Sequence, residues 1–388
     1  MRKTTISLIA ALALPCAVAL VGLPAAQAQS LVSTACGPTW TEQTVAGIGR
    51  LVDVTALSPT DAWAVGSGEG ISDKPAAAHW DGSAWNLVHL PQPAHSDAAD
   101  IRAISASGPD DVWAVGQYRH GLWFSFSEHW DGTSWTTVTT PSVPHDTMNL
   151  LNDVTAIAPD DAWAVGEHNL QGHLGDEHPD VEHWDGVSWT KVTVPTRPDS
   201  VALQVSASGP DDVSVLLYDH NVKPYVDRWN GTTWTLTRTD SHDKPANPIP
   251  SAIEALSPSD AWLAGSRMGN LPTQASPIAE HWDGAAWTRV HVPDANRADL
   301  PSGLAAVATN DVWMTGTRQL GAPGSTNSQA ESWNWNGASW SFVSIPASHP
   351  GAALAAADAL PTGEVWTVGT WFDDNGDTHG LIYQRCDT

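Results

Sequence analysis

Two short segments of this chain carry side chains that can move protons. Tyr118, Arg119 and His120 are consecutive, and His220 follows Tyr218 two positions later. Histidine and tyrosine can act as general acid or base, and arginine can hold a carboxylate through two hydrogen bonds. The chemistry that these residues would suit is cleavage of a polysaccharide that contains uronate, by a lyase or a glycoside hydrolase.

A second group of residues suits a metal ion. Between 167 and 180 the chain contains Glu167, His168, His173, Asp176, Glu177, His178 and Asp180. Imidazole together with carboxylate suits zinc or a similar divalent ion. Asp373, Asn375 and Asp377 alternate as in calcium-binding loops, although no glutamate follows at the twelfth position. We expect no required cofactor; zinc at the first place and calcium at the second are possible, and solvated loops are the alternative.

Tryptophan is abundant, with 22 residues in 388. Nineteen of them fall on three positions of a sequence repeat, where we expect them to pack in the core. Trp123, Trp333 and Trp371 lie off these positions, and they are the candidates for stacking on a ligand such as a sugar ring.

All these residues are spaced by that repeat. Residues 79–85 read HWDGSAW, and HWDGTSW, HWDGVSW, RWNGTTW, HWDGAAW and NWNGASW begin at 129, 183, 228, 281 and 334. A second signature, SPTDAWAVG from residue 58, has counterparts before most of these copies. The period is about 50 residues, which indicates a repeat architecture. In the fourth copy Ser214 replaces tryptophan, either through drift or because a binding site has replaced packing.

Each repeat contains four short runs of strand-forming residues and no helical periodicity. In the first repeat these runs are 52–57, 62–65, 76–80 and 85–90, with turn residues such as Asp81 and Gly82 between them. A four-stranded antiparallel sheet cannot bury both faces alone, so neighbouring sheets must stack, and radial stacking gives a β-propeller. The sequence therefore predicts an all-β, seven-bladed β-propeller of four-stranded antiparallel blades.

The last blade is expected to use both ends of the chain. Six blades are expected near 51–100, 101–150, 151–200, 201–250, 251–300 and 301–350, and the seventh combines 351–388 with 36–50. The C-terminal part lacks a fourth strand, and segment 40–45 resembles one. Cys36 and Cys386 flank this join, and in an exported protein such a pair indicates a disulfide bond.

The order of an apolar strand that ends in Gly, a variable loop, a strand that ends in Trp-Asp and a turn that leads to Trp resembles kelch and galactose-oxidase-type repeats. It also resembles repeats of secreted actinobacterial proteins. The second strand has one glycine, as at Gly66, where kelch has a pair, and the turn is shorter. The resemblance implies a propeller and no particular activity. Copper-radical oxidation needs a cysteine crosslinked to tyrosine, and closure of the ring already uses both mature cysteines.

Residues 1–28 have the pattern of a secretory signal peptide, since Arg2 and Lys3 precede an apolar run that ends in small residues. Residues 29–388 are then one secreted, extracellular domain, which we expect to be a monomer without membrane insertion. Seventeen Lys and Arg oppose 43 Asp and Glu, a net charge of −26. Such an acidic chain is a poor partner for nucleic acid.

The absence of a compact catalytic motif favours a binding module over an enzyme. We expect it to bind carbohydrate or another extracellular ligand, such as a protein, through the face where loops join the second and third strands and successive blades. The alternatives are the lyase or glycoside hydrolase above, and a purely structural or protein-partner role.

Overall fold

The computed structural model describes residues 36–69, 74–143, 146–169, 177–195, 199–219, 223–240, 248–268, 275–294, 298–320 and 327–386. The predicted signal peptide, His173 and His220 lie outside these residues. The described residues form 28 strands. In this part of the chain no helix has the length and apolar character that crossing a membrane requires.

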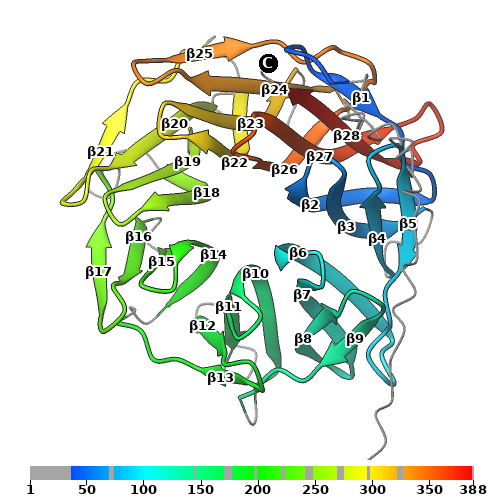
Figure 1. The fold of residues 1–388 in the computed structure, drawn as a ribbon, viewed down its shortest axis with the longest axis vertical. Coiled ribbons are helices and arrows are strands. Elements are labelled where there is room, and N and C mark those ends of the chain that lie inside the picture. Colours follow the sequence, from blue (N-terminus) through cyan, green and yellow to red (C-terminus); the bar gives the residue numbers. More distant parts are fainter. Residues whose placement is uncertain are drawn as a thin grey trace, which may run out of the picture. The chain divides into compact units, whose positions relative to one another are not determined.

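The strands form four-stranded antiparallel blades around a channel, which confirms the predicted seven-bladed propeller (Figure 1). Blade 1 contains β2 (Ile48–Ser58), β3 (Asp61–Gly68), β4 (Pro75–Trp80) and β5 (Trp85–His89). Blade 2 contains β6 (Ala98–Gly108), β7 (Asp111–His120), β8 (Leu122–Trp130) and β9 (Trp135–Val138). Blade 3 contains β10 (Met148–Ala158), β11 (Asp161–Asn169), β12 (Glu177–Trp184) and β13 (Trp189–Lys191).

Blade 4 contains β14 (Ser200–Gly209), β15 (Asp212–Asp219), β16 (Lys223–Trp229) and β17 (Trp234–Arg238). Blade 5 contains β18 (Pro248–Ser257), β19 (Asp260–Met268), β20 (Ala275–Trp282) and β21 (Trp287–Val290). Blade 6 contains β22 (Ala298–Ala308), β23 (Asp311–Gln319), β24 (Ser328–Trp335) and β25 (Trp340–Val343). Blade 7 contains β26 (Ala353–Ala359), β27 (Glu364–Phe372), β28 (Thr378–Cys386) and, from the other end of the chain, β1 (Thr41–Gln43).

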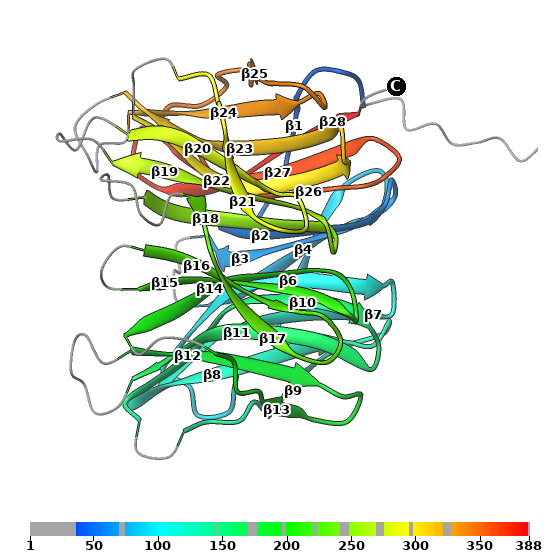
Figure 2. The same cartoon turned by 90° about the vertical axis from the view of Figure 1, so that its left-hand side faces the viewer.

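The first strand of each blade lines the channel, and the strands run from one face of the ring to the other (Figures 1 and 2). One face carries the turns that join first to second and third to fourth strands; we call it the turn face. The opposite face, the loop face, carries the connections between second and third strands and between blades. This geometry follows from antiparallel order within each blade.

Tryptophans from neighbouring blades fill the interfaces. The ring of Trp63 in blade 1 lies 5.2 Å from that of Trp130 and 5.4 Å from that of Trp135, both in blade 2. Corresponding clusters form around Trp113, Trp163, Trp262 and Trp366. Each large ring removes apolar surface from water at a seam between two sheets, so the repeated tryptophans hold the ring together.

The repeated histidines complete these interfaces. His79 Nε2 lies 2.8 Å from Asp61 Oδ1, and its ring stacks on Trp63 with centroids 4.2 Å apart. His129, His183 and His281 make the same two contacts in their own blades. The carboxylate orients the imidazole, and the imidazole covers one face of the buried indole.

Blade 4 keeps this arrangement with different residues. Ser214 stands in place of the second-strand tryptophan, and Arg228 in place of the histidine. The Arg228 guanidinium lies 4.8 Å from the ring centroid of Trp282 in blade 5, and its Nη2 lies 2.8 Å from Asp212 Oδ1. One arginine therefore supplies both the ion pair and the stacking surface at this interface.

The ring closes as the sequence predicts. β1 pairs antiparallel with β28, with Thr41 opposite Gln384. The ring centroid of Trp40 lies 5.6 Å from that of Trp313 in blade 6. Cys36 and Cys386 form a disulfide across a sequence separation of 350 residues, with Cα atoms 5.4 Å apart. The bond is typical of an oxidising, extracellular environment; secretion itself stays a prediction.

The single glycine at the end of the second strand has a steric cause. β2 bulges between Leu51 and Asp53, which brings its backbone close to Gly66 of β3. A Cβ atom at Gly66 would overlap the carbonyl oxygen of Arg50. The bulge therefore requires a residue without a side chain at this position.

Candidate functional site

The predicted acid-base residues lie at the loop face but do not form one site. Tyr118 stacks on Phe124, with centroids 5.5 Å apart, inside blade 2. Arg119 lies 5.9 Å from the ring of Trp123, and His120 Nδ1 lies 2.8 Å from the backbone oxygen of His95. Among the described residues, no hydrogen bond, ion pair or ring contact connects this group with Tyr218.

Tyr218 lies in β15 of blade 4, with blade 3 between it and blade 2 (Figure 1). Burial, together with the charge of Asp219, raises the pKa of Tyr218. A tyrosine with a raised pKa is a weaker proton donor at neutral pH, and its proposed partner His220 lies outside the described residues.

The predicted metal-binding residues are used in local contacts. His168 Nδ1 lies 2.7 Å from Asp146 Oδ2, and its ring stacks on that of His178 at 5.4 Å. Asp373 Oδ1 accepts hydrogen bonds from the backbone N–H groups of Asn375 and Asp377, at 2.8 and 2.9 Å. Among the described residues, no three His, Cys, Asp or Glu side chains are grouped to hold a metal ion. Zinc and calcium stay predictions.

The three off-pattern tryptophans differ in how much ring they offer. Trp333 is 1% exposed and lies in the core between blades 5 and 6, which leaves no ring face for a ligand. Both faces of Trp371 are covered, by His349 at 3.9 Å and His379 at 4.5 Å. Trp123 is half-buried beside Arg119. Of the three, Trp123 alone stays a candidate for stacking on a ligand.

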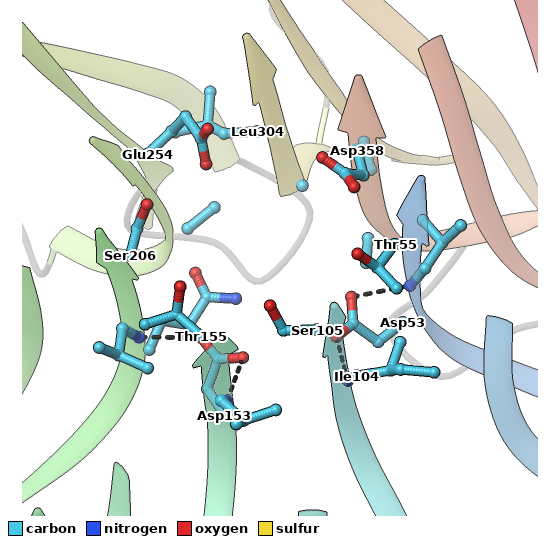
Figure 3. A pocket seen from close by; sticks show the side chains of 18 of the residues that line it. Asp53, Thr55, Ile104, Ser105, Asp153, Thr155, Ser206, Glu254, Leu304 and Asp358 are labelled. Atoms are coloured by element: carbon cyan, nitrogen blue, oxygen red, sulfur yellow. Dashed lines mark hydrogen bonds between the residues drawn. The ribbon is translucent and has the colours of Figure 1, made fainter. Parts of the chain in front are cut away.

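The central channel of the ring is lined by carboxyl side chains. It holds a cavity of about 260 Å³, lined by the inner strands (Figure 3). Four carboxyl side chains reach it, namely those of Asp53, Asp153, Glu254 and Asp358. No Lys, Arg or His is among the described residues that line it. Burial raises the pKa of Asp153 to about 7, of Glu254 to about 8 and of Asp358 to about 6. Burial also raises the pKa of Asp53 well above its usual range.

Three of these carboxyl groups join neighbouring blades. Asp53 accepts a hydrogen bond of 2.8 Å from the backbone N–H of Ile104 in the next blade, as Figure 3 shows. In the same way, Asp153 accepts a hydrogen bond of 2.8 Å from the backbone N–H of Val205. Asp358 accepts one of 2.7 Å from the backbone N–H of Ala56. Because backbone groups at the blade seams occupy these carboxylates, the channel is first of all a structural element.

The second cavity is a groove of about 910 Å³ at the turn face, between blades 3 and 4. We call it the tryptophan groove. The side chains that give it chemical character are Trp163, Trp229, Trp234, His183, Asp160, Asp161 and Asp211. Asp160 lies in the β10–β11 turn and Asp211 in the β14–β15 turn, so the repeat places equivalent carboxylates on both sides of the seam.

This interface is more open than the four other interfaces that contain the same pair of tryptophans. The centroids of Trp163 and Trp229 lie 6.3 Å apart, whereas the corresponding distance is 4.8 to 5.4 Å at four other interfaces. In blades 1, 2, 3 and 5 the equivalent indole N–H donates to a proline carbonyl at 3.1 Å. Trp229 has no such bond among the described residues, although Pro210 occupies the matching position. Its N–H is left available to a ligand.

Trp234 shows the same difference. Its ring is half-buried, whereas the equivalent rings of blades 1, 2, 3, 5 and 6 are at most 7% exposed. Sequence reasoning missed the groove because all its tryptophans occupy positions that the repeat assigns to packing. The available signal was the fourth copy, RWNGTTW, which contains Trp229 and Trp234 and departs from HWDG.

Comparison with known proteins shows the fold but no family. No family model matches the sequence, and neither does any curated protein. The structure is similar to YCF48 bound to a D1 peptide, with 14% identity, TM-score 0.57, and coverage of 91% of this chain and 98% of that one. It is also similar to the β-propeller domain of Myceliophteria thermophila Cps50 (Swd1), with 10% identity, TM-score 0.55, and coverage of 89% and 98%.

The GH74 xyloglucanase from Xanthomonas campestris matches with 12% identity and a TM-score of 0.54, over 88% of this chain and 55% of that one. At these identities the likeness shows the propeller fold alone. The resemblance to kelch and actinobacterial repeats stays a prediction.

Proposed function

We propose that this protein is a secreted β-propeller that binds carbohydrate in the tryptophan groove. The observation that carries the proposal is the open interface between blades 3 and 4, where three indole rings and three carboxylates line one cavity of about 910 Å³. Typical ligand sites have volumes of about 300 to 1,000 Å³ and combine apolar walls with a few polar groups. The groove has this size and this composition.

Each kind of lining group has a part in binding a sugar. The apolar C–H face of a pyranose ring stacks on an indole, and Trp229 and Trp234 are the half-buried rings that offer such a surface. The exposed carboxylates of Asp160 and Asp211 accept hydrogen bonds from sugar hydroxyls. The free N–H of Trp229 donates one. The proposal keeps the expected ligand class and moves the site from the loop face to the turn face.

The alternative is a polysaccharide lyase or glycoside hydrolase that uses the loop-face residues. Such an enzyme needs an acid and a base within reach of one substrate bond. The separation of Tyr118, Arg119 and His120 from Tyr218 by a whole blade favours binding over catalysis. The xyloglucanase among the similar structures supports only the compatibility of the fold with glycan chemistry.

A glycan array followed by titration calorimetry tests the proposal. We expect micromolar to millimolar binding of an oligosaccharide by the intact protein, and a loss of about 30-fold or more in Trp229→Ala, since a central aromatic anchor contributes about 2 kcal/mol. Trp130→Ala is the matched control, because Trp130 holds the same repeat position at a closed interface. Equal loss in both variants, or no glycan bound at all, would contradict the proposal. An assay for unsaturated sugar product tests the lyase alternative.

A further inference from the structure

The charge of the tryptophan groove indicates which sugars it selects. Three carboxylates lie in its lining, and neither Lys nor Arg is among the described residues that line it. The one imidazole, His183, is bound to Asp161 at 2.9 Å. The groove therefore presents uncompensated negative charge next to three indole rings.

We infer that the tryptophan groove selects amino sugars with a protonated amine, as in oligomers of glucosamine, over neutral and acidic sugars. The inference rests on the proposed function and adds the charge of the ligand. A cation is attracted by the face of an indole ring and by a nearby carboxylate at the same time. A uronate, by contrast, would bring a fourth carboxylate into the cavity and would be repelled.

Two of the carboxylates are free for this role. Asp160 and Asp211 are exposed and hold the same repeat position in blades 3 and 4, on the two sides of the groove. Asp161 is occupied by His183, so it contributes charge more than a direct contact. An ammonium group that lies between Asp160, Asp211 and a tryptophan ring would displace no existing ion pair.

Asp110 provides a matched control. It holds the position equivalent to Asp160 and Asp211 in blade 2, it is exposed, and it is not among the residues that line the groove. Asp110→Asn removes one charge from the same kind of turn and leaves the groove unchanged. Asp160→Asn with Asp211→Asn removes the two free carboxylates and retains the shape and hydrogen-bonding ability of the side chains.

The experiment measures the affinity of the intact protein for β-1,4-linked tetramers of glucosamine, N-acetylglucosamine and glucose, at about pH 6 and at low and high salt. We expect the glucosamine tetramer to bind about 10-fold more tightly than its N-acetyl form at low salt, since a cation–π contact with partial charge pairing has this magnitude. High salt reduces this preference, because it screens exposed charges. The double variant reduces it to about 2-fold, and Asp110→Asn leaves it unchanged.

The outcomes separate the inference from the proposed function. If the neutral tetramers bind as tightly as the glucosamine tetramer, the inference is wrong and the proposed function stands. If none of the tetramers binds and the glycan array is also empty, the proposed function fails. Raising the pH until the amine is neutral must weaken binding of the glucosamine tetramer only; an equal loss for the neutral tetramers would show that the preference does not come from the charge of the amine and would overturn the inference.

Discussion

Asp227 in β16 provides a quantitative test of how burial of a carboxyl group changes stability with pH. Its side chain is wholly buried, and neither carboxyl oxygen has a hydrogen-bond partner. Burial raises its pKa from 3.8 to about 7. The native state therefore keeps the proton where the unfolded chain has already lost it, and replacement by asparagine, Asp227→Asn, removes this difference.

The sign and size of the effect follow from proton linkage. Below pH 3.8 both states are protonated, and the group has no effect on stability. Between that pH and about 7 the unfolded state ionises first, so native stability falls by about 1.4 kcal/mol for each pH unit. The total loss by pH 8 is about 4 kcal/mol. The asparagine variant avoids this loss but buries an unpaired amide, at a constant cost of about 1 to 3 kcal/mol.

We therefore expect Asp227→Asn to be less stable than the unchanged protein at pH 4 and more stable at pH 8, by about 1 to 3 kcal/mol in each case. Urea unfolding followed by tryptophan fluorescence at several pH values measures both free energies. Asp110→Asn, at an exposed turn position, is the control for the loss of one carboxylate without burial. If the pH profiles of Asp227→Asn and the unchanged protein run parallel, Asp227 is not buried as an unpaired acid and the reasoning is refuted.

Three further predictions concern the ring. Cys36→Ser, or reduction of the bond to Cys386, should lower the free energy of unfolding by up to roughly 5 kcal/mol, as calorimetry under oxidising and reducing conditions would show; an unchanged midpoint would exclude the bond. Gly66→Ala should cost several kcal/mol because its Cβ overlaps the neighbouring strand; Gly108→Ala, where an added Cβ meets no atom within 4 Å, is the milder comparison in the same unfolding assay. Arg228→Ala should cost about 3 to 5 kcal/mol because it leaves buried Asp212 unpaired; a loss below 1 kcal/mol in urea unfolding would contradict the role of the ion pair.

The repeat predicted the ring because each of its features has a local physical cause. Asp81 and Gly82 specify a tight turn, and Trp80 and Trp85 bracket it at a fixed spacing, so the hairpin can be read from a single copy. Closure was predictable as well, since a repeat that lacks one strand must obtain it from the other end of the chain. These inferences depend on counting and on turn chemistry, which a sequence contains in full.

The site could not be predicted in the same way. Trp163 and Trp229 have the same identity and spacing as their counterparts. Their interface differs in the ring separation of 6.3 Å, in the missing indole hydrogen bond of Trp229 and in the greater exposure of Trp234. That distance depends on how two sheets settle against each other. The choice of Trp333 as a ligand-stacking residue could have been avoided. Side chains two residues apart in a strand lie on the same face, so Trp333 shares its face with the repeat tryptophan Trp335. A face that carries repeat tryptophans packs in the core, and Trp333 is buried there.

The pairing of β1 with β28 has a consequence for the order of events in the cell. Blade 7 receives its fourth strand from residues made before blades 1 to 6 and its other three strands from residues made after them. Blades 1 to 6 can form as the chain emerges, but an open arc exposes an apolar sheet face at each of its two ends. Those faces stay exposed until β28, which ends at Cys386, has been synthesised and blade 7 can form. The time taken to make and release the last blade therefore sets how long the chain is vulnerable to proteolysis and aggregation, and truncation by one strand at either end would extend that period indefinitely.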